Sequence, residues 1–233
     1  MVNGSLALCG AAGGVGTTRL TVACGTMLAR HGYDVAVLDA AYATQGLSDY
    51  VSGRLDPDMS ALCLGDDPLE TGLVDFDIDG GGRLAACPVR APFERLARAQ
   101  TPEAAQALER RMAEAARGFE FVLVDTPPVA SNQAVAAVTA AAHVALVCDE
   151  PRAVDAIPRG IDRLEDIGVD EVTRVVTGVE SHPDADVAVP RVGTDLSKLD
   201  TDTHDALATL LAAVFDVTVS TDADSTLRDR LPL

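Results

Sequence analysis

Apolar residues along this chain occur in short continuous runs that alternate with longer segments of helical periodicity. The first run covers residues 5–10 and ends in a glycine-rich turn at residues 11–18. In residues 18–30 apolar positions recur three and four residues apart, and a second apolar run follows at 34–39. Short apolar runs predict buried strands and the three-to-four spacing predicts a helix. A strand, a helix and a second strand in this order indicate two parallel strands joined by a helical crossover.

The same alternation continues along the rest of the chain. Further strands are predicted at residues 83–88, 119–124, 143–148 and 172–179, and helices at 101–117, 134–142, 151–167 and 203–214. Residues 43–82 are rich in Gly and Asp and predict a loop with short helical pieces. Strands that alternate with helices throughout predict one α/β domain over residues 1–233, a doubly wound, mostly parallel sheet with helices on both faces.

The turn after the first strand has the composition of a phosphate-binding loop. It contains Gly13, Gly14, Val15, Gly16, Thr17 and Thr18, between a predicted strand and a predicted helix. Glycines let successive backbone N–H groups face one anion, and a helix N-terminus adds the positive end of its dipole. Thr18 occupies the position of the hydroxyl that holds Mg²⁺ in such loops. The segment therefore predicts a site for nucleotide phosphates.

Two aspartates follow predicted strands and are candidate metal ligands. Asp39 ends the second strand, and Asp125 follows the strand at 119–124. Because the carboxyl ends of parallel strands meet at one edge of a sheet, we expect both near Thr18, and we predict Thr18, Asp39 and Asp125 as the Mg²⁺ site. The alternative for each aspartate is a cap on the turn that follows it.

Two stretches match the motifs of a known family. The family's loop reads K-G-G-V-G-K-T-T, where residues 12–19 read A-G-G-V-G-T-T-R, and its later strand runs into D-T-P-P, as at residues 125–128. The chain thus resembles the MinD/ParA group of P-loop ATPases, with their deviant Walker A loop, over nearly its whole length. The resemblance implies binding of ATP or ADP with Mg²⁺, and a role in chromosome partitioning or cell division.

Three polar side chains of that family are replaced in this chain. By similarity, Ala12 stands for the lysine that reaches across the ATP-bound dimer, Thr17 for the loop lysine, and Ala41 for the aspartate that positions water. Thr177 and Gly178 stand where the family has an asparagine that reads adenine. We therefore expect a degenerate loop without a catalytic residue, in a regulatory or positioning factor with weak or no ATP hydrolysis.

Two other functions stay open. A slow Mg²⁺-dependent ATPase would use Arg19, or potassium, in place of lysine, although an arginine at a helix start is also typical of an exposed side chain. A non-catalytic partner would pair with an intact MinD/ParA paralogue. The expected partner is in either case a protein, a second copy of this chain or such a paralogue.

The charge of the chain indicates the kind of cytoplasm in which it works and the partners that it disfavours. It has 36 acidic and 18 basic residues, a net charge of −18, and a single lysine, Lys198. This predicts a surface adapted to a salt-rich cytoplasm and a haloarchaeal source, the alternative being an acidic protein from a high-GC organism. The negative charge argues against direct binding to nucleic acid or to anionic lipid.

Several further site classes are disfavoured. The five cysteines form no CxxC pair and four lie in apolar runs, which predicts buried reduced thiols in a cytoplasmic protein. The four histidines lack metal-ligand spacing, so we expect no zinc site. The start has no signal-peptide pattern, and no long apolar run occurs. Residues 225–233 are short, charged and interrupted by Pro232, so we expect no membrane anchor.

Overall fold

The computed structural model describes residues 1–196 and 198–219, and the expectation about a membrane anchor in residues 225–233 falls outside them. The strands are β1 (Val2–Gly10), β2 (Val35–Asp39), β3 (Val74–Asp75), β4 (Leu84–Cys87), β5 (Phe121–Thr126), β6 (Ala141–Asp149), β7 (Thr173–Thr177) and β8 (Val187–Val189). The α-helices are α1 (Thr17–Arg30), α2 (Met59–Leu64), α3 (Phe93–Ala99), α4 (Pro102–Gly118), α5 (Asn132–Ala140), α6 (Ala153–Glu165) and α7 (Thr201–Phe215). Three 3₁₀ turns are η1 (Gly46–Tyr50), η2 (Leu69–Gly72) and η3 (Glu150–Arg152).

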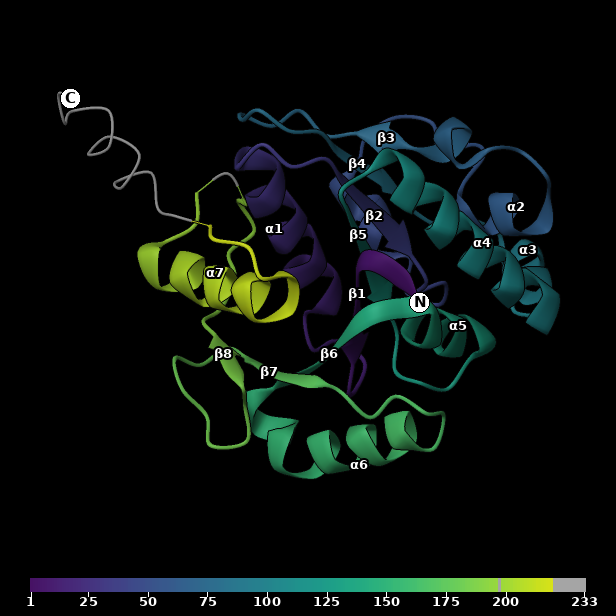
Figure 1. Ribbon diagram of the computed structural model, residues 1–233. Helices are drawn as coiled ribbons and strands as arrows, with labels where there is room; N and C mark the ends of the chain where they lie inside the picture. The colour runs from purple at the N-terminus through teal and green to yellow at the C-terminus, as the bar shows by residue number, and fades with distance from the viewer. Residues whose placement is uncertain (197, 220–233) are drawn as a thin grey trace, which may run out of the picture.

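Within the described residues the strands form one eight-stranded sheet in the order β3-β4-β2-β5-β1-β6-β7-β8 (Figure 1). Each neighbouring pair is parallel except β3 with β4. The predicted doubly wound, mostly parallel sheet is therefore confirmed. Strand β1 is central, and its neighbours β5 and β6 follow it more than a hundred residues later along the chain.

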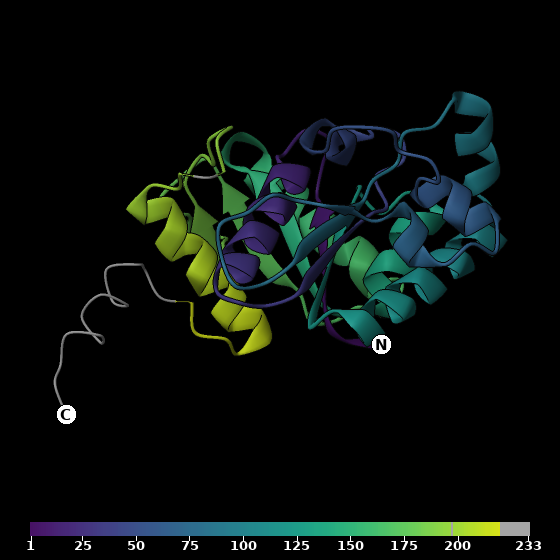
Figure 2. The ribbon, with the colours of Figure 1, turned by 90° about the horizontal axis from the view of Figure 1, so that it is seen from above.

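Helices cover both faces of the sheet and create two hydrophobic cores. Alternate side chains of β1 point to opposite faces: Leu6 and Leu8 belong to the core under α1 and α7, and Ala7 and Cys9 to the core under α2, α4, α5 and α6. Helices α1 and α7 lie side by side on their face (Figures 1 and 2). Because the central strands are buried on both faces, they consist of continuous apolar runs.

The five cysteines are free and buried, as their sequence context predicts. Cys24 lies on α1 and belongs to the core under α1 and α7. The other four belong to the opposite core; they are Cys9, Cys63, Cys87 and Cys148. Burial raises the pKa of Cys9 and of Cys24 to about 12, so these thiols stay protonated at physiological pH.

Most predicted elements are present, with their ends displaced by a few residues. The loop expected at 43–82 contains α2, two 3₁₀ turns and the short strand β3. The sequence patterns did not predict β3, α3 or β8. Among the described helices, none combines the length and apolar character needed to cross a membrane.

Candidate functional site

The loop between β1 and α1 lies at the carboxyl edge of the sheet. It leads from Gly10, the last residue of β1, to Thr17, the first residue of α1. The backbone N–H of Ala11 donates to the carbonyl of Val147 in β6 at 2.7 Å, which fixes the start of the loop to the neighbouring strand. The predicted loop residues thus occupy the place at which ligands bind in open α/β sheets.

The backbone of this loop has the conformation of an anion-binding nest. Gly14 and Gly16 have φ of 76° and 89°, in the left-handed region, and Val15 between them does not. Such alternation turns successive N–H groups toward one side. Gly16 is also the N-cap of α1, and neither a side-chain cap nor an acidic residue satisfies the first turn of that helix. The free N–H groups and the helix dipole therefore favour a bound anion here.

Thr18 and Asp125 lie together beneath this loop. The hydroxyl of Thr18 donates to Oδ2 of Asp125 at 2.6 Å. Asp125 is only 1% exposed, and its Oδ1 has no hydrogen-bond partner among the described residues. Burial raises the pKa of Asp125 to about 6. A buried carboxylate oxygen without a partner is costly, and a cation would compensate it.

These two side chains fit Mg²⁺. The ion prefers oxygen ligands, keeps several waters and is commonly held by one or two protein groups together with phosphate oxygens. The Thr18 hydroxyl oxygen and Oδ1 of Asp125 are such groups, and bound Mg²⁺ would supply positive charge next to the phosphates. Among residues 1–196 and 198–219, no set of three or more His, Cys, Asp or Glu residues could hold a metal ion.

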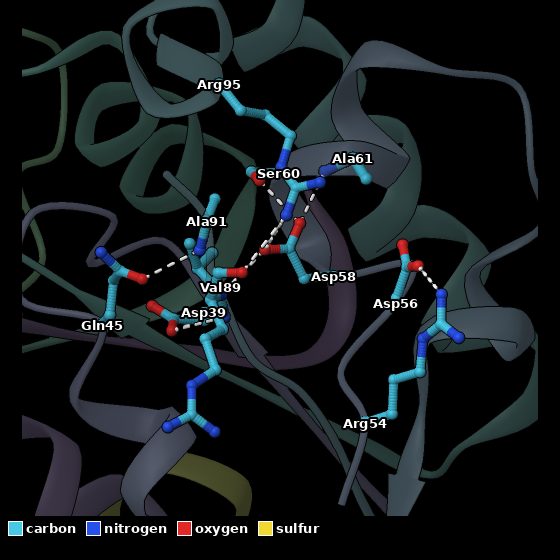
Figure 3. Close-up of polar contacts among 11 residues, drawn as sticks. Asp39, Gln45, Arg54, Asp56, Asp58, Ser60, Ala61, Val89, Ala91 and Arg95 are labelled. Atoms are coloured by element: carbon cyan, nitrogen blue, oxygen red, sulfur yellow. Dashed lines mark hydrogen bonds and ion pairs between the residues drawn. The ribbon is translucent and has the colours of Figure 1, made fainter. Parts of the chain in front are cut away.

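Asp39 is next to Asp125 in the sheet but makes different bonds. The two residues are register partners on β2 and β5. Both oxygens of Asp39 accept backbone N–H groups. Oδ1 accepts from Ala41 at 2.8 Å, and Oδ2 accepts from Val89 at 2.9 Å (Figure 3). Its full burial and the charge of Asp125 raise its pKa to about 8. Asp39 caps the turn after β2 and binds the loop that follows β4, and its role as a metal ligand stays a prediction.

Ala12 lies in the loop, Thr17 begins α1, and Ala41 follows β2; these are the positions that lack a charged side chain. Ala41 is buried, and Ala12 and Thr17 are half-buried. Arg19 turns to other segments: it donates to the carbonyl of Val192 at 3.3 Å and to the hydroxyl of Tyr50 at 3.5 Å. Arg19 is thus a half-buried side chain of α1 that contacts η1 and the loop after β8, and neither of these hydrogen bonds reaches residues 11–16.

Two polar contacts to the loop were missed by the sequence analysis. Nη1 of Arg152, in η3, donates to the carbonyl of Gly13 at 2.9 Å, and Nε bonds Oδ1 of Asp149 at 2.6 Å. The hydroxyl of Thr177, at the end of β7, donates to the carbonyl of Val15 at 3.0 Å. The available signal was position along the sequence, because Arg152 follows the strand predicted at 143–148 and Thr177 lies near the end of the strand predicted at 172–179.

A second polar cluster stabilises the loops beside the site (Figure 3). Asp58 is fully buried at the N-cap of α2 and accepts hydrogen bonds from Ser60, Ala61, the backbone of Arg90 and the guanidinium of Arg95. Since these donors come from α2, from the loop after β4 and from α3, one carboxylate holds three segments together.

Comparison with solved structures places this architecture among known folds. A cobyrinic acid a,c-diamide synthase from Mycobacterium smegmatis, with a bound ATP analogue and magnesium, has a TM-score of 0.67 and 20% identity, covering 93% of this chain and 98% of that one. A chain of the MinC–MinD cell division complex from Aquifex aeolicus has a TM-score of 0.66 and 20% identity, covering 98% and 97%. A ParA family ATPase from Chlorobium tepidum has a TM-score of 0.67 and 14% identity, covering 97% of both chains.

These likenesses show the fold, a P-loop nucleotide-binding fold of the MinD and ParA type. The resemblance expected from the loop motifs is therefore confirmed for the fold. No protein-family model matches the sequence, and no curated protein is significantly similar to it.

Proposed function

We propose that this chain is a regulatory or positioning factor that binds ATP or ADP with Mg²⁺ on residues 13–18 and hydrolyses ATP slowly or not at all. The Thr18–Asp125 pair carries the proposal. Within the described part of the chain, a buried carboxylate oxygen of Asp125 has no hydrogen-bond partner, and it lies next to the N-terminus of α1, which no side chain caps. A backbone cradle for the phosphates and a place for the metal ion would then lie side by side, which supports the proposal. The neighbouring structures that hold an ATP analogue or ADP with magnesium support this choice of ligand.

Weak hydrolysis follows from the side chains at three positions. Ala12 and Thr17 offer no positive charge to the transferred phosphoryl group, and Ala41 offers no carboxylate to an attacking water. Loss of one group that stabilises transition-state charge costs about 100- to 1,000-fold in rate. With three such groups replaced, the loop is degenerate and the chain acts by binding.

A binding protein of this fold exerts its effect through a partner. Solved neighbours include a cell division complex and a ParA family ATPase, so partitioning or division-site placement is the proposed process. The proposed partner is a second copy of this single-domain chain or an intact paralogue, in a salt-rich, haloarchaeal cytoplasm.

The test is calorimetry of ATP and ADP binding, in molar KCl with Mg²⁺, on protein stripped of nucleotide. We expect a dissociation constant below about 100 μM, or roughly −5.5 kcal/mol, and weaker binding when EDTA replaces Mg²⁺. Absence of any binding would overturn the proposal.

A phosphate-release assay separates the proposal from a slow ATPase. We expect release at the background rate of the Asp125→Ala variant. Mg²⁺-dependent release that Asp125→Ala abolishes would instead establish an ATPase that works without loop lysines.

A further inference from the structure

Arg152 places a guanidinium against the phosphate loop from a different part of the fold. It lies 139 residues from Gly13, whose carbonyl accepts from its Nη1 at 2.9 Å. Among the described basic residues, Arg152 is the one whose side chain donates a hydrogen bond to residues 11–16. Its side chain is 40% exposed, so a ligand on the loop can reach it.

The position of this guanidinium is set by rigid elements. Arg152 is the last residue of η3 and the N-cap of α6, directly after β6, which pairs with β1. Asp149, the last residue of β6, accepts from Nε at 2.6 Å and orients the group. Sites on such elements hold their geometry better than sites on free loops.

The guanidinium keeps donors available for a ligand. Arginine has five N–H donors in a planar fork, and two of them are used by Asp149 and Gly13. The remaining three suit phosphate oxygens, which arginine binds with two parallel hydrogen bonds. A polyphosphate on this loop meets no lysine at positions 12 or 17, in a chain of net charge −18, so any positive charge in addition to Mg²⁺ has to come from another part of the fold.

We propose that Arg152 binds the phosphates of the nucleotide and replaces the positive charge of the two absent loop lysines. This inference rests on the proposed function, because it concerns the same site. Arg152 would then distinguish ligands with phosphates from ligands without them. The affinity for ATP and ADP depends on Arg152, and the affinity for adenosine, which has no phosphate, does not.

The test compares wild-type protein with Arg152→Gln, Arg152→Lys and Arg159→Gln by calorimetry with Mg²⁺-ADP, Mg²⁺-ATP and adenosine. Arg159 is the matched control, since it is exposed on α6 and its Nε bonds the carbonyl of Asp155, away from the loop. We expect Arg152→Gln to bind ADP and ATP at least tenfold more weakly with adenosine binding unchanged. We expect the ADP and ATP affinities of Arg152→Lys to lie between those of wild type and Arg152→Gln. The affinities of Arg159→Gln should equal those of wild type. Melting without nucleotide verifies that each variant is folded.

The outcomes separate the two proposals. If the wild type binds neither nucleotide, the proposed function fails. If the wild type binds and Arg152→Gln binds ADP within twofold of it, only the role of Arg152 is overturned. Should Arg152→Gln fail to fold, Arg152→Met carries the test, because methionine keeps an unbranched side chain without a charge or a hydrogen-bond donor. ADP affinity of Arg152→Met within twofold of the wild-type value overturns the inference.

Discussion

Replacing Asp125 by asparagine should stabilise the protein without nucleotide, although it removes the proposed Mg²⁺ ligand. The carboxylate is buried next to Asp39 in the sheet, and one of its oxygens has no hydrogen-bond partner in residues 1–196 and 198–219. An asparagine can still accept the Thr18 hydroxyl through its carbonyl oxygen, and it has no charge to bury. The substitution therefore removes an electrostatic cost while it keeps the size of the side chain.

The magnitude follows from the raised pKa of Asp125. Burial raises it to about 6 from the ordinary 3.8. Between these values the folded state holds a proton that the unfolded state has lost, so stability falls as pH rises through this range, and above it the full cost remains. The difference corresponds to about 3 kcal/mol. Asp39, whose pKa is raised to about 8 partly by the charge of Asp125, extends the decline toward pH 8.

The assay is urea unfolding at pH 5 and pH 8, in molar KCl without nucleotide or Mg²⁺. We expect wild type to lose stability from pH 5 to pH 8, and Asp125→Asn to be more stable than wild type by up to about 3 kcal/mol at pH 8. The gain in the free energy of unfolding should be smaller at pH 5, because Asp125 of the folded wild type is then mostly protonated. Asp66→Asn removes one exposed charge and is the control for general repulsion.

Two results would refute this reasoning. One is an Asp125→Asn variant that is less stable than wild type at pH 8, which would mean that the carboxylate makes stabilising contacts when charged. The other is an equal gain for Asp66→Asn, which would assign the effect to net charge. With Mg²⁺ and ADP present the order should reverse, because only wild type keeps the proposed ligand.

Three further substitutions test other contacts. Asp58→Ala should cost about 3–5 kcal/mol in urea unfolding, because the guanidinium of Arg95 loses its buried partner, whereas Asp56→Ala, in an exposed ion pair, should cost under about 1 kcal/mol. Gly14→Ala should cost about 1 kcal/mol, or about 2–4 °C in a calorimetric melt, since φ is 76° and nothing crowds the added methyl. Thr177→Val removes the donor to the loop and should cost about 1 kcal/mol in urea unfolding and weaken ADP binding by calorimetry.

The central elements could be predicted from the sequence because burial on both faces leaves an unmistakable pattern. β1, β2 and β5 each contain a continuous apolar run, and α4 begins after Thr101, whose hydroxyl caps it. α3 lacks such a pattern, since only Leu96 and Ala99 of its seven residues are buried. The edge strands β8 and β3 have three and two residues. These are too few to show an alternation of apolar and polar positions.

The candidate site was predictable where its residues are adjacent in sequence. The glycines and Thr18 form one motif, and Asp125 follows a clear strand. The contacts of Arg152 and Thr177 depend on β6 lying beside β1 and β7 beside β6, across 139 and 162 residues. Spacing along the chain does not encode that order, so these two contacts with the loop could be found only from the structure.

The buried thiols are divided unequally between the two cores, so their reactivity can show which helical layer separates from the sheet. An alkylating reagent reacts with an exposed thiolate, so each cysteine is modified only when the layer that covers it separates. Cys24 reports the layer of α1 and α7, and the other four report the opposite layer. The order in which mass increments appear on these peptides therefore distinguishes a molecule that opens on one side from a molecule that unfolds as a unit.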